Sequence, residues 1–166
     1  MSERIKTAVL RDFSVSLCRA AGLSADNAAL LTDSILFAEC RGVTSHGLLR
    51  LPQYIARLRS GATASNVPMP FTMESGGTAR LDAQNGLGQL AGRKASDKAE
   101  ELAAEYGVSF VAVANSNHFG TGAWYAIPAA RRGFFAFNIS SAASAMAPHG
   151  AAQPLLLFGP DVGHGV

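Results

Sequence analysis

The sequence predicts an α/β protein that begins with a helical segment. Apolar residues recur at three-to-four spacing through residues 1–61, which is the period of an amphipathic helix. Residues 108–139 then read as strand, polar loop, helix and strand, an order typical of a βαβ unit. We therefore expect a helical N-terminal segment (residues 1–61), a partial α/β domain (62–150) and an atypical tail (151–166).

Three helices are expected in the N-terminal segment, each bounded by residues that favour helix ends. The first stops at Gly22, because glycine adopts the left-handed conformation that closes many helices. Ser24 is a good N-cap for the second, which ends before Gly42. The third tolerates Pro52 only in its first turn and closes at Gly61.

The α/β part is predicted from short apolar runs separated by glycine and proline. Its expected elements are strands at Phe71–Glu74 and Ala79–Ala83, a helix at 87–106, a strand at Val108–Ala114, a helix at 123–132 and a strand at Phe134–Ile139. The first two strands form a hairpin or two edge strands. The run from Val108 and the run from Phe134 are expected to pair in parallel.

Charge and hydropathy exclude several classes of function. The net charge is +2 and the basic residues are dispersed, whereas nucleic-acid binding requires a clustered basic face. No apolar run approaches the roughly 20 residues that a membrane helix needs. Residues 1–15 alternate charged and apolar positions, unlike a signal peptide. We expect a cytoplasmic protein with neither nucleic-acid nor membrane partners.

The first candidate motif is Thr44-Ser45-His46-Gly47, followed by Arg50 and Tyr54, at the junction of two predicted helices. If the helix begins near Ser45, the spacing of four places His46, Arg50 and Tyr54 on one face. Such a face suits a small 2-oxo or 2-hydroxy acid, because arginine binds a carboxylate through two hydrogen bonds and histidine bonds the C2 oxygen. The alternative is a serine N-cap beside a solvent-facing arginine and a surface tyrosine.

The second motif is the loop Asn115–Gly120, which contains His118 and connects a strand to the next helix. Ligand sites of α/β sheets lie at the carboxyl ends of strands. Histidine exchanges protons near neutral pH, and the oxidation of an alcohol by hydride transfer requires a base for the hydroxyl proton. The alternative is a loop histidine that caps the following helix.

The third motif is the turn Ala147-Pro148-His149-Gly150, preceded by Ser140, Ser141 and Ser144. These hydroxyls either contact a cofactor or are ordinary turn residues. A Rossmann fingerprint is absent, because Tyr125 stands where the third glycine would be. The four histidines lack the spacing of a metal site, so no bound metal is expected.

Together these motifs resemble a known family more specifically than any one alone. The segments T-S-H-G-L-L-R-L-P-Q-Y, V-A-N-S-N-H-F-G and A-P-H-G, in this order, resemble the malate/L-lactate dehydrogenase family of the non-Rossmann type. The resemblance covers roughly residues 5–150. It implies an NAD- or NADP-dependent 2-hydroxyacid dehydrogenase with its own α/β fold, usually a homodimer.

The resemblance also implies roles for individual residues. His118 would be the catalytic acid/base, assisted by His46. Substrate would be held by Ser45, His46, Arg50 and Tyr54. The cofactor would lie near Ser140, Ser141, Ser144 and His149.

Members of this family are about twice as long as this chain, so the resemblance implies an N-terminal half. Ala151 stands where a second glycine is expected, and Phe158–Asp161 bears little likeness to the family's next segment. Two interpretations follow. The chain is a truncated dehydrogenase for a small 2-hydroxy or 2-oxo acid, or it is an inactive fragment that acts at most as an interaction module.

Overall fold

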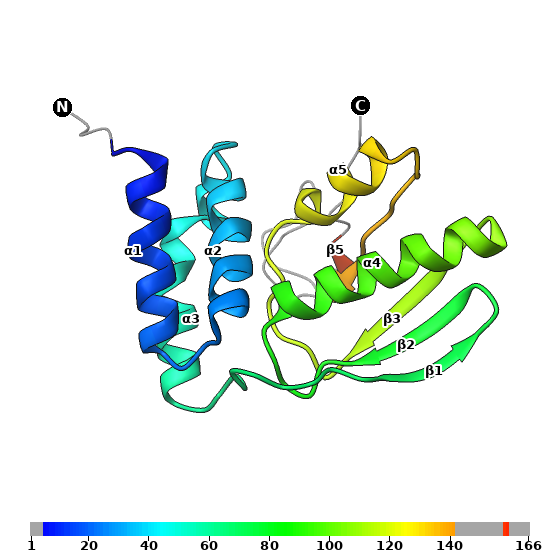
Figure 1. The fold of residues 1–166 in the computed structure, drawn as a ribbon, viewed down its shortest axis with the longest axis horizontal. Helices are drawn as coiled ribbons and strands as arrows, with labels where there is room; N and C mark the ends of the chain where they lie inside the picture. The colour runs from blue at the N-terminus through cyan, green and yellow to red at the C-terminus, as the bar shows by residue number, and fades with distance from the viewer. Residues whose placement is uncertain (1–4, 142–157, 160–166) are drawn as a thin grey trace, which may run out of the picture. The chain divides into compact units, whose positions relative to one another are not determined.

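A computed structural model describes residues 5–141 and 158–159 of the chain (Figure 1). The chain divides into two compact units, Met1–Thr121 and Gly122–Val166. The first unit contains both the helical segment and the main sheet. The second contains a short helix and a two-stranded pairing. The predicted α/β class is confirmed.

Three helices open the first unit, as predicted: α1 (Thr7–Ala20), α2 (Ala25–Glu39) and α3 (Leu51–Arg59). The Ser24 hydroxyl accepts a hydrogen bond from the backbone N–H of Asn27 and caps α2, while Pro52 occupies the first turn of α3. Gly22, with φ of 99°, follows α1 in the left-handed conformation expected of a helix stop. Within the described part of the chain, no helix is both long and apolar enough to span a membrane.

Two single turns of 3-10 helix, η1 (Thr44–His46) and η2 (Leu48–Arg50), connect α2 to α3. The predicted third helix therefore starts later than the apolar pattern suggested. Its regular part begins at Leu51, after the non-helical backbone of Gly47 (φ −92°, ψ −145°) and the single turn η2.

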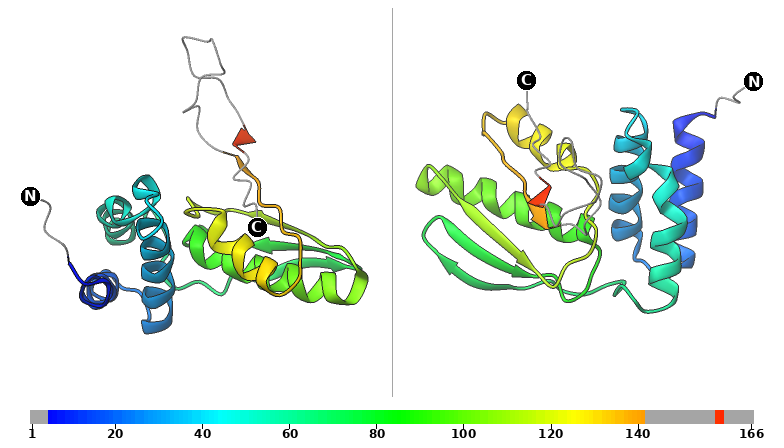
Figure 2. Two further views of the ribbon diagram at one scale, coloured as in Figure 1. Left: turned by 90° about the horizontal axis from the view of Figure 1, so that it is seen from above. Right: turned by 180° about the vertical axis from the view of Figure 1, so that it is seen from behind.

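The main sheet has the order β1-β2-β3, formed by β1 (Phe71–Ser75), β2 (Thr78–Asp82) and β3 (Phe110–Ala114). β1 and β2 form an antiparallel hairpin, whereas β2 and β3 run parallel. The helix α4 (Gly88–Tyr106) makes the crossover between β2 and β3 and packs on one face of the sheet (Figures 1 and 2). The carboxyl ends of β2 and β3 therefore lie side by side.

One hydrophobic core joins the helices of the first unit to its sheet. It gathers buried apolar side chains from α1, α2, α3, α4 and β2, among them Cys18, Leu31, Ile35, Leu58, Leu81 and Leu90. Because these elements share a core, the segment between α2 and α3 is held on the same body as the ends of β2 and β3.

The second unit corrects one prediction. Helix α5 (Ala123–Arg131) is present as expected, but residues 134–139 form no strand. The βαβ unit consists instead of β2, α4 and β3. An apolar run becomes a strand only when a neighbouring backbone pairs with it, and Phe135, Phe137 and Ile139 stay exposed. A short strand β4 (Ser140–Ser141) follows and pairs antiparallel with β5 (Phe158–Gly159).

Candidate active site

A pocket of about 240 Å³ lies in the first unit, between α3 and the loop that follows β3. Its lining residues come from four separate stretches of the chain: Arg50, Gln53, Tyr54, Arg57, Thr63, Leu87, Asn117 and His118. Two of these residues carry a guanidinium group and none is acidic. The pocket therefore favours an anionic ligand.

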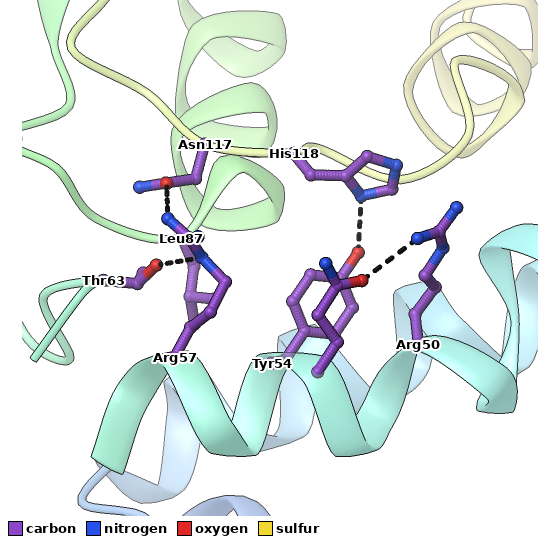
Figure 3. A pocket seen from close by; sticks show the side chains of 8 residues that line it. Arg50, Tyr54, Arg57, Thr63, Leu87, Asn117 and His118 are labelled. Carbon is purple, nitrogen blue, oxygen red and sulfur yellow. Dashed lines mark hydrogen bonds between the residues drawn. The ribbon is translucent and has the colours of Figure 1, made fainter. Parts of the chain in front are cut away.

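Side chains on one face of the η2–α3 segment form one wall of this pocket. Figure 3 shows Arg50, Tyr54 and Arg57 in a row, directed toward Asn117 and His118. Their spacing of four and three residues is that of neighbours on one helix face. The three side chains therefore share one face, although the helix changes from 3-10 to α at Leu51.

His118 lies on the loop after β3, and its exposed side chain has two aromatic neighbours. Its Nδ1 is 2.7 Å from the Tyr54 hydroxyl. Its ring stacks on that of His46, with centroids 5.3 Å apart and planes inclined by 26°. The Ser45 hydroxyl in turn lies 3.0 Å from Nδ1 of His46. Two imidazoles and a phenol are thus assembled from segments more than 60 residues apart.

Arg50 is oriented by its own neighbours. Its Nε donates to the backbone oxygen of Ser45 at 2.7 Å, and its Nη1 donates to Oε1 of Gln53 at 3.0 Å. A guanidinium carries five N–H donors. These two bonds orient the group at the pocket and leave further donors for a carboxylate.

The Tyr54 side chain is buried and is fixed by a second buried side chain. Its ring is 5% exposed, and its hydroxyl accepts a hydrogen bond of 2.6 Å from Nε2 of Gln89, whose side chain is 1% exposed. Burial raises the pKa of the Tyr54 phenol, an effect that the Gln89 hydrogen bond and the positive charge of Arg50 partly offset. The phenol is therefore protonated at neutral pH and acts as a hydrogen-bonding group.

The loop that carries His118 is anchored through Asn117. Its Oδ1 accepts a hydrogen bond of 2.8 Å from Nη2 of Arg57. Its Nδ2 donates to the backbone oxygens of Asn85 and Gly86, at 3.0 and 2.9 Å, just past the end of β2. This one amide joins the ends of the two parallel strands to α3.

Two glycines permit close backbone approaches beside the site. A Cβ on Gly88, the first residue of α4, would overlap the carbonyl oxygens of Asn117 and His118. A Cβ on Gly47 would overlap the carboxylate of Glu39, which accepts a 2.8 Å hydrogen bond from the N–H of Leu48. Glu39 is the last residue of α2 and ties that helix to η2.

This arrangement can bind an anion and exchange a proton with it. Guanidinium groups, an imidazole and a neutral phenol line a pocket smaller than the roughly 300–1,000 Å³ typical of drug-sized ligands, and a second imidazole stacks on the first. A small carboxylic acid fits such a volume, and histidine is the usual proton-exchanging side chain near neutral pH.

Comparison with known proteins assigns the chain to a family. A family model for malate/L-lactate dehydrogenase matches residues 5–160. The chain belongs to the malate/L-lactate dehydrogenase family. The match extends ten residues beyond residue 150, where the sequence analysis ended the resemblance.

Individual members of the malate/L-lactate dehydrogenase family match along most of this chain. It is 33% identical to a malate dehydrogenase of Pyrococcus abyssi, over 92% of this chain and 42% of that protein. It is 35% identical to an NADP(+)-dependent (2R)-3-sulfolactate dehydrogenase of Chromohalobacter salexigens, over 93% of this chain and 46% of that protein. The chain thus spans less than half the length of these relatives.

A solved structure of the malate/L-lactate dehydrogenase family has the same fold. The sulfolactate dehydrogenase of Methanocaldococcus jannaschii superposes with a TM-score of 0.86 and 32% identity, covering 92% of this chain and 44% of that one. The described fold is therefore the family's own arrangement of helices and sheet.

The structure brings the predicted catalytic and substrate-binding residues together. Ser45, His46, Arg50, Tyr54 and His118 all lie in or beside one pocket, through the contacts given above. The predicted cofactor residues belong to the second unit. Ser140 and Ser141 form β4 in the second unit, and Ser144 and His149 lie outside the described residues.

Sequence reasoning missed three residues of the site: Arg57, Gln89 and Gly88. Arg57 follows Tyr54 by three, so the helical spacing that selected Arg50 and Tyr54 could have found it. Gly88 and Gln89 open a helix after a glycine-rich turn. Nothing in the pattern around them indicates that Gly88 approaches a loop about 30 residues later or that Gln89 contacts Tyr54.

Proposed function

We propose that the chain forms the substrate-binding and proton-exchanging part of an oxidoreductase that converts a small 2-hydroxy acid to the 2-oxo acid, and back. The observation that carries the proposal is His118, which stacks on His46 and bonds to Tyr54 in a pocket that also holds Arg50. Relatives named malate and sulfolactate dehydrogenases support the same reaction class.

In this proposal Arg50 binds the substrate carboxylate through two parallel hydrogen bonds. His46 and Ser45 contact the oxygen on C2. His118 takes the hydroxyl proton when the alcohol is oxidised and returns it when the ketone is reduced. The C2 carbon loses a hydride in the first direction and gains one in the second, so electrons and protons balance.

NAD or NADP accepts or supplies that hydride when bound. The pocket volume of about 240 Å³ suits the acid and is too small for a dinucleotide. Ser140, Ser141, Ser144 and His149 stay the proposed cofactor contacts, as the family resemblance implies. A homodimer and a cytoplasmic location belong to the same proposal.

The test is a titration of the purified 166-residue chain with NADH and with NADPH, followed by nucleotide fluorescence. Saturable binding, and oxidation of the bound nucleotide on addition of a 2-oxo acid such as oxaloacetate or pyruvate, are the expected results. A folded chain that neither binds nor oxidises either nucleotide would refute the function for this chain by itself.

An inactive interaction module is the second candidate. The observation that favours it is the alternation of exposed Phe135, Phe137 and Ile139 in a segment that forms neither helix nor strand, a pattern that suits pairing with a strand of another polypeptide. Light scattering of the purified chain tests it, since a strictly monomeric chain that is active toward a 2-oxo acid would refute it.

A further inference from the structure

A histidine that exchanges a proton at Nε2 needs a constant partner at Nδ1. In the neutral base the remaining proton is on Nδ1, and in the imidazolium both nitrogens carry one. Nδ1 is therefore a donor throughout the cycle, and its partner has to accept, as in the triad logic of serine hydrolases. In His118 that partner is the Tyr54 hydroxyl, at 2.7 Å.

A phenol that accepts from Nδ1 has to place its own proton elsewhere. Gln89 is the other described group within hydrogen-bonding distance of the Tyr54 oxygen, at 2.6 Å. Tyr54 keeps its proton because burial raises its pKa. Gln89 thus decides the direction of the whole chain of hydrogen bonds. If it donates through Nε2, Tyr54 donates to Nδ1, and the neutral imidazole carries its proton on the wrong nitrogen.

The length of the bond favours the opposite orientation of this amide. The distance of 2.6 Å is short for N–H···O bonds, which span about 2.7–3.2 Å, and ordinary for O–H···O bonds, which span about 2.5–3.0 Å. The two ends of a glutamine amide are nearly identical in shape, so the same side-chain position accommodates either.

We propose that Gln89 is a positioning residue that presents Oε1 to the Tyr54 hydroxyl, so that Tyr54 accepts from Nδ1 of His118 and Nε2 exchanges the substrate proton. The inference rests on the proposed function only where it says that Nε2 exchanges its proton with a substrate. Its physical content, the tautomer of His118, does not require substrate, nucleotide or turnover.

The test is nitrogen NMR of the whole chain labelled with ¹⁵N-histidine, at a pH where the imidazole is neutral. The His118 signals are assigned by their loss in His118→Asn. Wild type is expected to show the proton on Nδ1. Gln89→Met removes the acceptor and is expected to shift His118 toward the Nε2–H form that unconstrained imidazole favours.

Two further variants keep the test decisive. Gln89→Glu retains an acceptor oxygen and is expected to keep the proton on Nδ1. Thr32→Val removes another fully buried polar group, bonded to Cys18, and is expected to leave the His118 tautomer unchanged. It controls for a general loss of stability.

Each outcome supports or overturns the inference. A wild-type Nε2–H tautomer would overturn it, and so would a folded Gln89→Met chain that keeps the proton on Nδ1. Should Gln89→Met not fold, loss of the Nδ1 proton in Gln89→Glu would overturn it as well. A wild-type Nδ1–H tautomer in a chain that oxidises no nucleotide would refute the proposed function and leave the positioning role intact.

Discussion

Replacing Tyr54 by phenylalanine removes one oxygen atom and two hydrogen bonds. The ring stays, so no cavity forms. The bond to His118 ends at an exposed imidazole that water can solvate, whereas Gln89 is 1% exposed and loses its described partner. A buried polar group without a partner costs about 1–3 kcal/mol. We expect Tyr54→Phe to lower the free energy of unfolding by that amount.

Urea unfolding followed by far-UV circular dichroism measures this effect. With a slope of about 1–3 kcal/mol/M, a loss near 2 kcal/mol moves the midpoint by about 1 M. The matched control is Tyr106→Phe, which removes an exposed phenol hydroxyl and is expected to change stability by less than about 0.5 kcal/mol. Equal midpoints for the two variants would contradict the reasoning.

The raised pKa of Tyr54 adds a second signature with a definite sign. An acid whose pKa is higher in the folded state contributes stability that is fully present below its unfolded pKa, about 10 for tyrosine, and is lost as the pH rises through the folded value. Wild type should therefore lose up to about 1.4 kcal/mol per pH unit above pH 10, relative to Tyr54→Phe. If the difference in unfolding free energy between wild type and Tyr54→Phe does not narrow above pH 10, the Tyr54 phenol ionises as easily in the folded state as in the unfolded state.

Three further predictions concern the loop and its pocket. His118→Asn should lower turnover of a 2-oxo acid by about two to four orders of magnitude, whereas a loss under about threefold would remove it from the proton step. Arg50→Lys should raise KM with little change in kcat, because a single ammonium cannot bond the Ser45 oxygen and a carboxylate in the same planar geometry; an unchanged KM would exclude Arg50 from substrate binding. Gly88→Ala should destabilise the chain by about 1–3 kcal/mol and displace the loop, since its Cβ would overlap the carbonyl oxygen of Asn117; urea unfolding at the wild-type midpoint would contradict this.

Local signals in the sequence predicted much of the fold. The ends of α1 and α2 followed from Gly22 and Ser24, because caps and stops depend on a single residue's conformation or hydroxyl. The prediction of a strand at Phe134–Ile139 was wrong because strand formation depends on a partner that is distant in sequence. An apolar run shows that a segment can be a strand, and only the partner backbone decides whether it is one.

The candidate site was predictable to the extent that its residues carry unusual chemistry. His46, Arg50, Tyr54 and His118 attract notice as histidines, an arginine and a tyrosine at helical or loop positions. Gln89 does not, because a glutamine near a helix start is ordinary on its own. Its importance comes from burial and from the hydroxyl it meets, and both are tertiary properties.

The attachment of the His118 loop to α3 has a mechanical consequence. Tyr54 and Arg57 lie within one turn of the same helix and bond two consecutive loop residues, across 64 and 60 residues of chain. A loop attached at one point can rotate about it, whereas two attachments to one rigid turn remove that rotation. Losing the bond to Arg57 leaves Asn117 attached to the backbone oxygens of Asn85 and Gly86, whereas losing the bond to Tyr54 removes the contact that orients the imidazole itself. The two attachments therefore differ in what they fix: one the loop, the other the ring.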